Sequence, residues 1–381
     1  GNGDHQGSGR VGGDGVMASF DEVLKDCTKL GTKIPTSEYL ENGKYPIIDQ
    51  GQNDIAGYYD SDDGLFEDVP TIVFGDHTRI VKYIDKPCFL GADGVKLLCP
   101  VSKDTNCKYL FYQLAHADIP NTGYNRHFKW IKALNFKIPS SDEQNHVVEV
   151  LDKVTELISL RKQQLARLDE LVKARFVEMF GDAKLNPYDF PCNSLSEYIL
   201  FLTSGSRGWS QYFTDNGEYF ITIKNVKNCR ITLQDVQYVI PPDNAEAKRT
   251  KVQENDLLIS ITADLGRTGV VPKEIAKHGA YINQHLTCIR LNLEKVNPIY
   301  VAYYMESDAG KEQFASKNQS AVKAGLNFNA INSLKLIVPP LSLQNDFAAF
   351  VERVDQQKQT VQQSLEKLEL MKKALMQEYF G

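Results

Sequence analysis

Two stretches of the chain carry apolar residues at helical spacing. In residues 143–179 the apolar positions follow one another at steps of three, four and seven, and Lys, Arg, Gln, Glu and Asp fill most positions between them. Residues 347–379 show the same steps. This pattern is typical of the apolar seam of a coiled coil beside solvated helix faces, and it does not fit a strand. We therefore predict two long helices.

The two predicted helices belong to an internal repeat. Residues 134–181 align without a gap with residues 334–381, so that Gln144 meets Gln344. A proline stands before each predicted helix and a glycine after it, as expected of helix start and stop signals. Because different sequences precede the two copies, the repeat predicts the order block, helix, block, helix with approximate two-fold symmetry.

A single helix with this pattern would expose its apolar seam, so we expect the two copies to pair. If the second helix returns from the second block to the first, the pair is an antiparallel coiled coil. The alternative is that each helix packs on its own neighbouring block.

The two blocks carry many short strand signals, separated by Gly, Asn and Asp turns. The clearest signals lie at residues 45–49, 71–74, 219–223 and 257–261. A weak kinship also joins the blocks, because their loops begin with similar Gly-containing tripeptides, 31–33 and 205–207. We expect an α+β fold in which two mixed α/β blocks are separated by two long helices with pseudo-two-fold symmetry.

These patterns place the domain boundaries. The expected segments are a disordered leader at 1–16, a first block at 17–140, a central helix at 141–181, a second block at 182–340 and a C-terminal helix at 341–381. The leader is Gly-rich, and Met17 is the expected natural start. Its Gly-x-Gly-x-x-Gly match predicts no dinucleotide site, because no strand precedes it and no helix follows it.

Composition adds limits on function. The 381 residues are 42% hydrophobic and 24% charged, and the net charge of −6 argues against indiscriminate nucleic-acid binding while leaving room for a local basic face. The seven cysteines lack Cys-x-x-Cys and metal-ligand spacing, so we expect reduced thiols in a cytoplasmic protein. No run of about 18 apolar residues is present, so no membrane role is expected.

Sequence motifs of enzymes are absent. No Walker lysine motif, His-Glu-x-x-His or Gly-x-Ser-x-Gly occurs, and the turn at 186–188 lacks the second proline of an amino-methyltransferase loop. We therefore predict no catalytic residue, no cofactor and no metal. A scattered acidic nuclease site is the alternative, because such sites have loose spacing.

Several stretches together resemble a known family. They are 203–210, 219–227, 339–344, 45–52 and 55–59. The chain is similar over about residues 20–381 to the specificity subunit of type I DNA restriction–modification systems. The start of the first helix departs from the family pattern but keeps its proline and glutamine.

The resemblance implies a non-catalytic reader of double-stranded DNA. Two target-recognition domains would each read one half of a split target, and the paired helices would set the gap between the halves. The helices would also dock two copies of a modification (methyltransferase) subunit that carries the S-adenosylmethionine site. Those subunits would recruit a restriction/translocase subunit. The other readings are a coiled-coil scaffold with two protein-binding heads and a stand-alone nuclease or methyltransferase fragment.

Candidate DNA contacts are cations, amides and aromatic side chains in Gly-rich loops, since base edges need bidentate partners and phosphates need cations. In the first block they are Lys33, Gln50, Gln52, His77, Arg79, Lys96 and Arg126, with Asp76, Asn125 and His127 beside them. In the second block they are Arg207, Trp209, Lys224, Asn225, Lys227, Arg267, Gln284, His285, Lys317 and Lys323, with Asn283 and Asn318 beside them.

For each candidate the competing interpretation is a solvated surface group or a turn residue, and Trp209 equally fits a core aromatic. If the DNA interpretation holds, the acidic residues between 60 and 68 should face away from phosphates.

Overall fold

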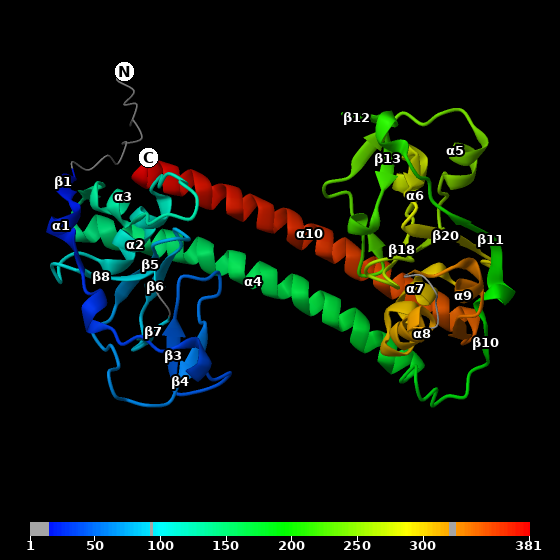
Figure 1. Ribbon diagram of the computed structural model, residues 1–381, viewed down its shortest axis with the longest axis horizontal. Coiled ribbons are helices and arrows are strands. Elements are labelled where there is room, and N and C mark those ends of the chain that lie inside the picture. The colour runs from blue at the N-terminus through cyan, green and yellow to red at the C-terminus, as the bar shows by residue number, and fades with distance from the viewer. Residues whose placement is uncertain (1–14, 92–93, 320–324) are drawn as a thin grey trace, which may run out of the picture. The chain divides into compact units, whose positions relative to one another are not determined.

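The computed structural model describes residues 15–91, 94–319 and 325–381. The chain forms two compact units: unit 1 combines the chain up to Gln163 with Gln362–Gly381, and unit 2 is Gln164–Val361. The division falls within both long helices, α4 (Ser141–Phe180) and α10 (Leu341–Phe380), so each unit contains part of each helix (Figure 1).

The strands of unit 1 form two sheets and a short ribbon. The larger sheet is antiparallel in the order β2-β8-β5-β6: Leu24–Asp26, Val95–Pro100, Thr71–Gly75 and Val81–Ile84. The smaller sheet has the order β4-β3-β7: Gly57–Tyr59, Tyr45–Ile48 and Phe89–Leu90. The ribbon pairs β1 (Val16–Ser19) with β9 (Asn135–Ile138), so its first strand includes the last residue of the expected leader.

Strand β5 is buried at every position because both of its faces are covered. Ile72 and Phe74 pack into a cluster with Leu110 of helix α2 (Cys107–His116). Val73 points into a second cluster with Ile48 of the smaller sheet. Alternate side chains of a strand point to opposite faces, so this one strand joins these two clusters. The short helices α1 (Phe20–Val23) and α3 (Phe128–Lys132) complete the unit.

The helix segments of unit 1 pack antiparallel. Near the start of α4, Val147 and Leu151 lie in one cluster with Met376 from the end of α10. Further along α4, Lys162 forms a salt bridge of 3.1 Å with Glu369. Sequence position rises along α4 while it falls along α10, as an antiparallel pair requires.

Unit 2 has two four-stranded sheets. One has the order β11-β20-β17-β18: Ile199–Ser204, Leu286–Leu291, Leu257–Ser260 and Thr268–Val270. The other has the order β12-β16-β13-β19: Phe213–Thr214, Gln237–Val239, Glu218–Ile221 and Ala280–Ile282. Two ribbons pair β10 (Cys192–Ser194) with β21 (Lys335–Ile337) and β14 (Val226–Lys227) with β15 (Arg230–Ile231). The helices are α5 (Ala245–Thr250), α6 (Lys273–His278), α7 (Pro298–Glu306), α8 (Asp308–Gln319) and α9 (Phe328–Asn332).

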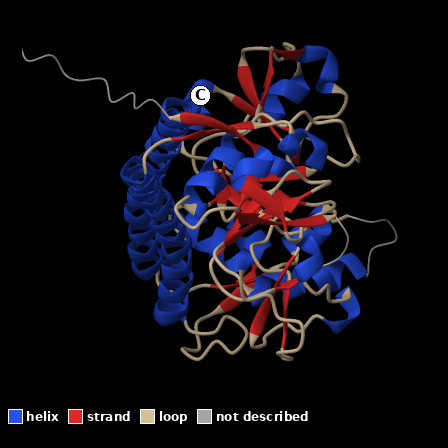
Figure 2. Cartoon of the chain, turned by 90° about the vertical axis from the view of Figure 1, so that its left-hand side faces the viewer, coloured by secondary structure: helices blue, strands red, loops and turns tan. Residues whose placement is uncertain are grey.

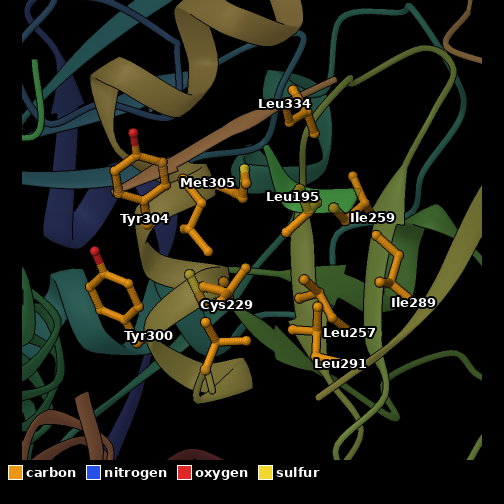
Figure 3. Close-up of a cluster of buried hydrophobic side chains, with 14 of the residues drawn as sticks. Leu195, Cys229, Leu257, Ile259, Ile289, Leu291, Tyr300, Tyr304, Met305 and Leu334 are labelled. Atoms are coloured by element: carbon orange, nitrogen blue, oxygen red, sulfur yellow. The ribbon is translucent and has the colours of Figure 1, made fainter. Parts of the chain in front are cut away.

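The main core of unit 2 lies between its first sheet and helix α7. Figure 3 shows Tyr300, Tyr304 and Met305 of α7 facing leucine and isoleucine side chains of β17 and β20. The helix segments join this core, because Phe176 of α4 stacks on Tyr300 at a ring distance of 5.8 Å and meets Phe347 of α10 at 5.4 Å. These segments are again antiparallel, and both views show the two long helices side by side (Figures 1 and 2).

The same hydrogen-bonded clamp starts each long helix. In unit 1 the Oε1 atom of Gln144 accepts from the backbone N–H of Asn106 at 2.9 Å, and its Nε2 atom donates to the carbonyl of Pro139 at 2.9 Å. In unit 2 the side chain of Gln344 makes the corresponding bonds. It accepts from the N–H of Asn297 at 2.9 Å and donates to the carbonyl of Pro339 at 2.8 Å. Both glutamines are buried. The amide thus satisfies backbone groups that burial would otherwise leave without partners.

The α+β class and the antiparallel pairing of the long helices are confirmed. The four strand signals correspond to β3, β5, β13 and β17. Among the described residues, no helix is both long enough and apolar enough to cross a membrane. All seven cysteines are free thiols, and burial raises the pKa of Cys88 and Cys107 to about 12.

Candidate nucleic-acid interface

Three loops of unit 1 meet at the end of strand β5. They are the turn after β5 (76–80), the segment after β3 (49–53) and the loop before α3 (119–127), which we call the first loop cluster. The backbone N–H of His77 donates to Oε1 of Gln50 at 3.2 Å, and the guanidinium of Arg79 donates to the carbonyl of Ile119 at 3.0 Å. These bonds bring together candidates that are far apart in the sequence.

Buried polar groups fix this cluster from below. Asp76 is buried, its Oδ1 atom accepts from the backbone N–H of Phe128 at 2.7 Å, and its carbonyl accepts from the N–H of His127 at 2.8 Å. The ring of His127 is fully buried, with Nδ1 2.9 Å from the same carbonyl. Asp76 and His127 therefore act as anchors of the loop and are not available as DNA contacts.

The exposed surface of the first loop cluster carries polar and aromatic side chains. Arg126 and Gln52 are exposed, and Gln50 is half-buried. Tyr124 is 87% exposed and stacks on the ring of His77 at 4.6 Å and 8°. Amide, guanidinium and aromatic groups are thus presented together, and these are the groups that recognise base edges.

Outside the first loop cluster, two candidates lie on other parts of unit 1. Lys96 forms a salt bridge of 3.1 Å with Asp26 and lies over the ring of Phe128, so much of its charge is balanced within the unit. Lys33 is exposed and precedes the buried Ile34.

Unit 2 has a corresponding set of loops, which we call the second loop cluster: residues 204–210, 261–267 and 283–285. The backbone N–H of Ser206 donates to the carbonyl of Ile282 at 2.9 Å, and the N–H of Gln284 donates to the carbonyl of Ser206 at 3.0 Å. Nδ1 of His285 lies 2.8 Å from the hydroxyl of Thr262. Gln284 and His285 help to line an open pocket of about 220 Å³. The exposed Arg207 follows Ser206 directly.

The remaining cations of unit 2 differ in how far they are engaged. Arg267 forms a salt bridge of 2.5 Å with Asp264, and the ammonium of Lys317 donates to Ser333 at 2.7 Å. Lys224 and Lys227 are exposed. Gly266 allows the Arg267 turn to lie close to the core, because its φ is +78° and an added Cβ would come within 2.3 Å of the Phe314 ring.

Both loop clusters are built on one backbone framework. In unit 1 the N–H of Asp76 donates to the carbonyl of Gly94 at 2.7 Å, and in unit 2 the N–H of Ile261 donates to the carbonyl of His285 at 3.0 Å. In the loop before α3, the N–H of His127 donates to the carbonyl of Asp76. In the loop before α9, the N–H of Leu326 donates to the carbonyl of Ile261 at 2.9 Å. The repeat thus extends from the helices to the loops, while the side chains on the loops differ.

The sequence matches the type I restriction modification DNA specificity domain over residues 21–170 and 205–370. The chain belongs to this family. It is a DNA specificity subunit of a type I restriction–modification system. The subunit family is non-catalytic.

Known relatives are similar over most of their length. The MjaX type I restriction enzyme specificity subunit of Methanocaldococcus jannaschii is 23% identical over 91% of this chain and 86% of its own length. A type I restriction enzyme specificity subunit of Escherichia coli is 22% identical over 84% of this chain and 82% of its own length.

Solved structures share the fold. The S subunit of a type I restriction–modification system from M. genitalium has a TM-score of 0.62 at 16% identity, covering 98% of this chain and 97% of that one. A chain from a structure that describes complex assembly of the type I R-M system has a TM-score of 0.51 at 15% identity, covering 96% of this chain and 97% of that one.

Besides Asp76 and His127, two further candidate DNA contacts are buried. Trp209 is 4% exposed, and its ring packs against Phe220 and Tyr281, so it is the core aromatic that the sequence also allowed. Asn225 is 1% exposed, and its side chain bonds to backbone groups of residues 222, 232 and 234. Neither side chain is presented to DNA in this conformation. Lys323 lies outside the described residues.

Sequence reasoning missed two features beside the loop clusters. Tyr124 is one, because exposure of an aromatic cannot be read from its neighbours in sequence. The other is the basic helix α5, which has no counterpart among the described residues of unit 1. Its Arg249 donates to the carbonyl of Ser204 at 2.8 Å, which places the helix beside the second loop cluster. The run from Lys248 to Lys251, with three cations in four residues, was the available signal.

Five exposed acidic residues of unit 1 precede strand β5, whereas the first loop cluster includes the turn after it. They are Asp60, Asp62, Asp63, Glu67 and Asp68, all exposed and all before the start of β5. The five residues of β5, at about 3.3 Å each, separate Glu67 and Asp68 from the turn after the strand. Asp60 and Asp62 instead accept hydrogen bonds from Lys44, just before β3. That these residues face away from phosphates stays a prediction.

Proposed function

We propose that each loop cluster reads one half of a bipartite target in double-stranded DNA. The observation that carries the proposal is the shared framework at the ends of β5 and β17, which presents different side chains in the two units. A duplicated scaffold with unlike loops suits two readers of unlike sequences. On this proposal the recognition domains are residues 17–140 and 182–340, and the spacer helices are 141–181 and 341–381.

The exposed side chains supply the chemistry for reading. In the first loop cluster Gln50 and Gln52 offer amides, which pair with adenine in the major groove, and Arg126 offers a guanidinium. In the second, Arg207 is the candidate for guanine and Gln284 for adenine. Lys33, Lys224 and Lys227 are exposed cations that suit phosphates, which set affinity and register without carrying sequence information.

The two long helices fit the role of a spacer. Each is continuous over 40 residues, and each contributes to both units. A continuous helix rises about 1.5 Å per residue and does not change length under small forces. Two half-sites on such a connector gain affinity through effective concentration, but only when the DNA offers them at the permitted spacing.

The helices also present repeat-related apolar positions to a partner. Leu171 on α4 is 47% exposed and lies in unit 2, and its repeat counterpart Met371 on α10 is 44% exposed and lies in unit 1. Apolar side chains at equivalent places suit two copies of one partner. We assign these places to two modification subunits, which carry the S-adenosylmethionine site and in turn recruit a restriction/translocase subunit.

Mapping of methylated bases tests the reading role. A host that carries this chain with its modification subunit is expected to methylate a motif of two short sequences separated by a gap of unspecified bases. Methylation at a single undivided sequence, or none that depends on this chain, contradicts the proposal.

Charge substitutions test the docking role. Leu171→Asp or Met371→Asp alone is expected to leave one modification subunit bound, and the two together none, as read from the mass of the native complex. Gln357→Asp places the same charge at an exposed polar position of α10 and is the matched control, expected to keep both copies. Retention of both copies by the double variant contradicts the assignment.

A further inference from the structure

Tyr124 is the most exposed large aromatic of the first loop cluster, and it is held in place. It is 87% exposed, yet its ring lies flat on His77 at 4.6 Å and 8°. Such a ring leaves apolar surface in contact with water, and this exposure does not stabilise the fold. Stacking on His77 fixes where this ring lies in the cluster.

The support beneath the ring is rigid. Nδ1 of His77 lies 3.2 Å from the carbonyl of Asn125, and the backbone N–H of His77 donates to Gln50. The buried Asp76, which precedes His77, joins this turn to the loop before α3. Its carbonyl accepts from the N–H of His127, and its carboxylate accepts from the N–H of Phe128. Tyr124 thus stacks on an imidazole that is itself held by hydrogen bonds, and such support lowers the entropic cost of making a contact.

Gly94 brings a second group close to this site. An added Cβ there would come within 2.7 Å of both the Gln50 amide and the His77 ring. The glycine thus leaves room for both the amide of Gln50 and the imidazole that supports Tyr124. The Gln50 side chain and the Tyr124 ring thus both adjoin His77, one through its backbone N–H and the other through its imidazole.

One face of the Tyr124 ring stacks on the His77 ring, and this limits what that face contacts. A side chain that intercalates needs both faces free, because a base lies on each side of it. With His77 on one face, Tyr124 has only its edge and its other face to offer. In stacked duplex DNA the base faces are hidden, and the apolar group that reaches the major groove is the C5-methyl group of thymine.

We propose that Tyr124 contacts the C5-methyl group of a thymine in the half-site read by the first loop cluster, which makes it a specificity-determining residue. This inference rests on the proposed function, because it requires that the cluster read duplex DNA. The hydrogen-bonding neighbours then read the polar edges of the adjacent bases, while Tyr124 distinguishes thymine from cytosine by the methyl group.

The test uses the full chain in complex with its modification subunit. Binding sequences are first selected from a pool of random duplexes, and Arg207→Ala identifies the half-site read by unit 2. Each thymine of the other half-site is then replaced singly by deoxyuridine, which lacks only the methyl group. One replacement is expected to weaken binding about fourfold, the effect of one buried methyl group. Tyr124→Ala is expected to bind the thymine and uracil duplexes equally, and Tyr124→Phe is expected to keep the difference.

Matched positions complete the design. Thymines of the half-site read by unit 2 are the internal control, since uracil there should affect the parent and Tyr124→Ala equally. A first half-site without a methyl-sensitive thymine overturns the inference. A Tyr124→Ala variant that still distinguishes thymine from uracil also overturns it. A thymine of this half-site that reacts with permanganate overturns it as well, because such reactivity indicates an unstacked base. Failure of the parent complex to select any motif would instead contradict the proposed function itself.

Discussion

The two loop clusters hold the same backbone bonds and differ in the side chains placed on them. After β5 the framework residue is Asp76, which caps α3, whereas after β17 it is Ile261, and α9 is capped by Asn327. The carbonyl that accepts from this framework residue belongs to Gly94 in unit 1 and to His285 in unit 2. Gly94 leaves room for Gln50 and His77, whereas the His285 side chain bonds to Thr262. One backbone thus supports two different surfaces.

This comparison shows how a duplicated fold acquires two specificities. The bonds that define the framework use backbone N–H and carbonyl groups, which every substitution except proline retains. The side chains on the loops are therefore free to diverge without loss of the fold. A change of one cluster should alter one half-site and leave the other half-site intact.

The packing at the start of each long helix differs more between the two units than the backbone framework of the loops does. In unit 2, Phe347 lies among the rings of Phe176, Phe180 and Tyr303 at 5.3–5.5 Å. Its repeat counterpart in unit 1 is Val147, which packs with Leu151 and Met376. The aromatic set buries more area per side chain, so the same positions should contribute unequally to the stability of the two units.

Truncation at this pair of positions should show the largest difference. Phe347→Ala is expected to cost about 3–5 kcal/mol of unfolding free energy, because it removes a buried ring and leaves a cavity. Val147→Ala is expected to cost about 1–2 kcal/mol, since it removes two methyl groups. The measurement is urea unfolding followed by tryptophan fluorescence, and the chain has one tryptophan in each unit, Trp130 and Trp209. Equal losses would contradict the unequal packing of the helix ends.

The loops give the next largest expected difference. Arg207→Ala is expected to weaken recognition of one half-site by about 1–3 kcal/mol, because a guanidinium contacts a guanine through two hydrogen bonds. Competition binding with duplexes altered in one half at a time measures this. Arg126→Ala is the corresponding test in the first loop cluster and should affect only the other half-site. Equal weakening on every duplex would make Arg207 a phosphate contact.

The parts predicted from the sequence are those with local or repeated signals. The seam of α4 and α10 is visible because apolar residues recur at helical steps, and the aligned repeat pairs Gln144 with Gln344. Strands such as β5 are visible as short apolar runs between turns. These features depend on residues that are near in sequence or repeated, so a single chain suffices to find them.

The loop clusters were predicted only in part, because their geometry depends on distant residues. The bond between His77 and Gln50 joins positions 27 residues apart, and no local pattern indicates it. Trp209 lies in a Gly-rich stretch that suggests an exposed loop, but a short 3-10 helix turns its ring into the cluster of Phe220 and Tyr281. Burial of a single side chain is a property of the assembled unit, so sequence alone does not give it.

The spacing of the two half-sites tests the central claim most directly. Four residues inserted near Lys162 and four near Gln362 lengthen both helices together by about 6 Å, at about 1.5 Å per residue. Mapping of methylated bases in a host carrying this variant with its modification subunit is expected to show both half-site sequences unchanged and the gap between them longer. The parent gap retained by the variant, with both half-sites still recognised, would contradict the account.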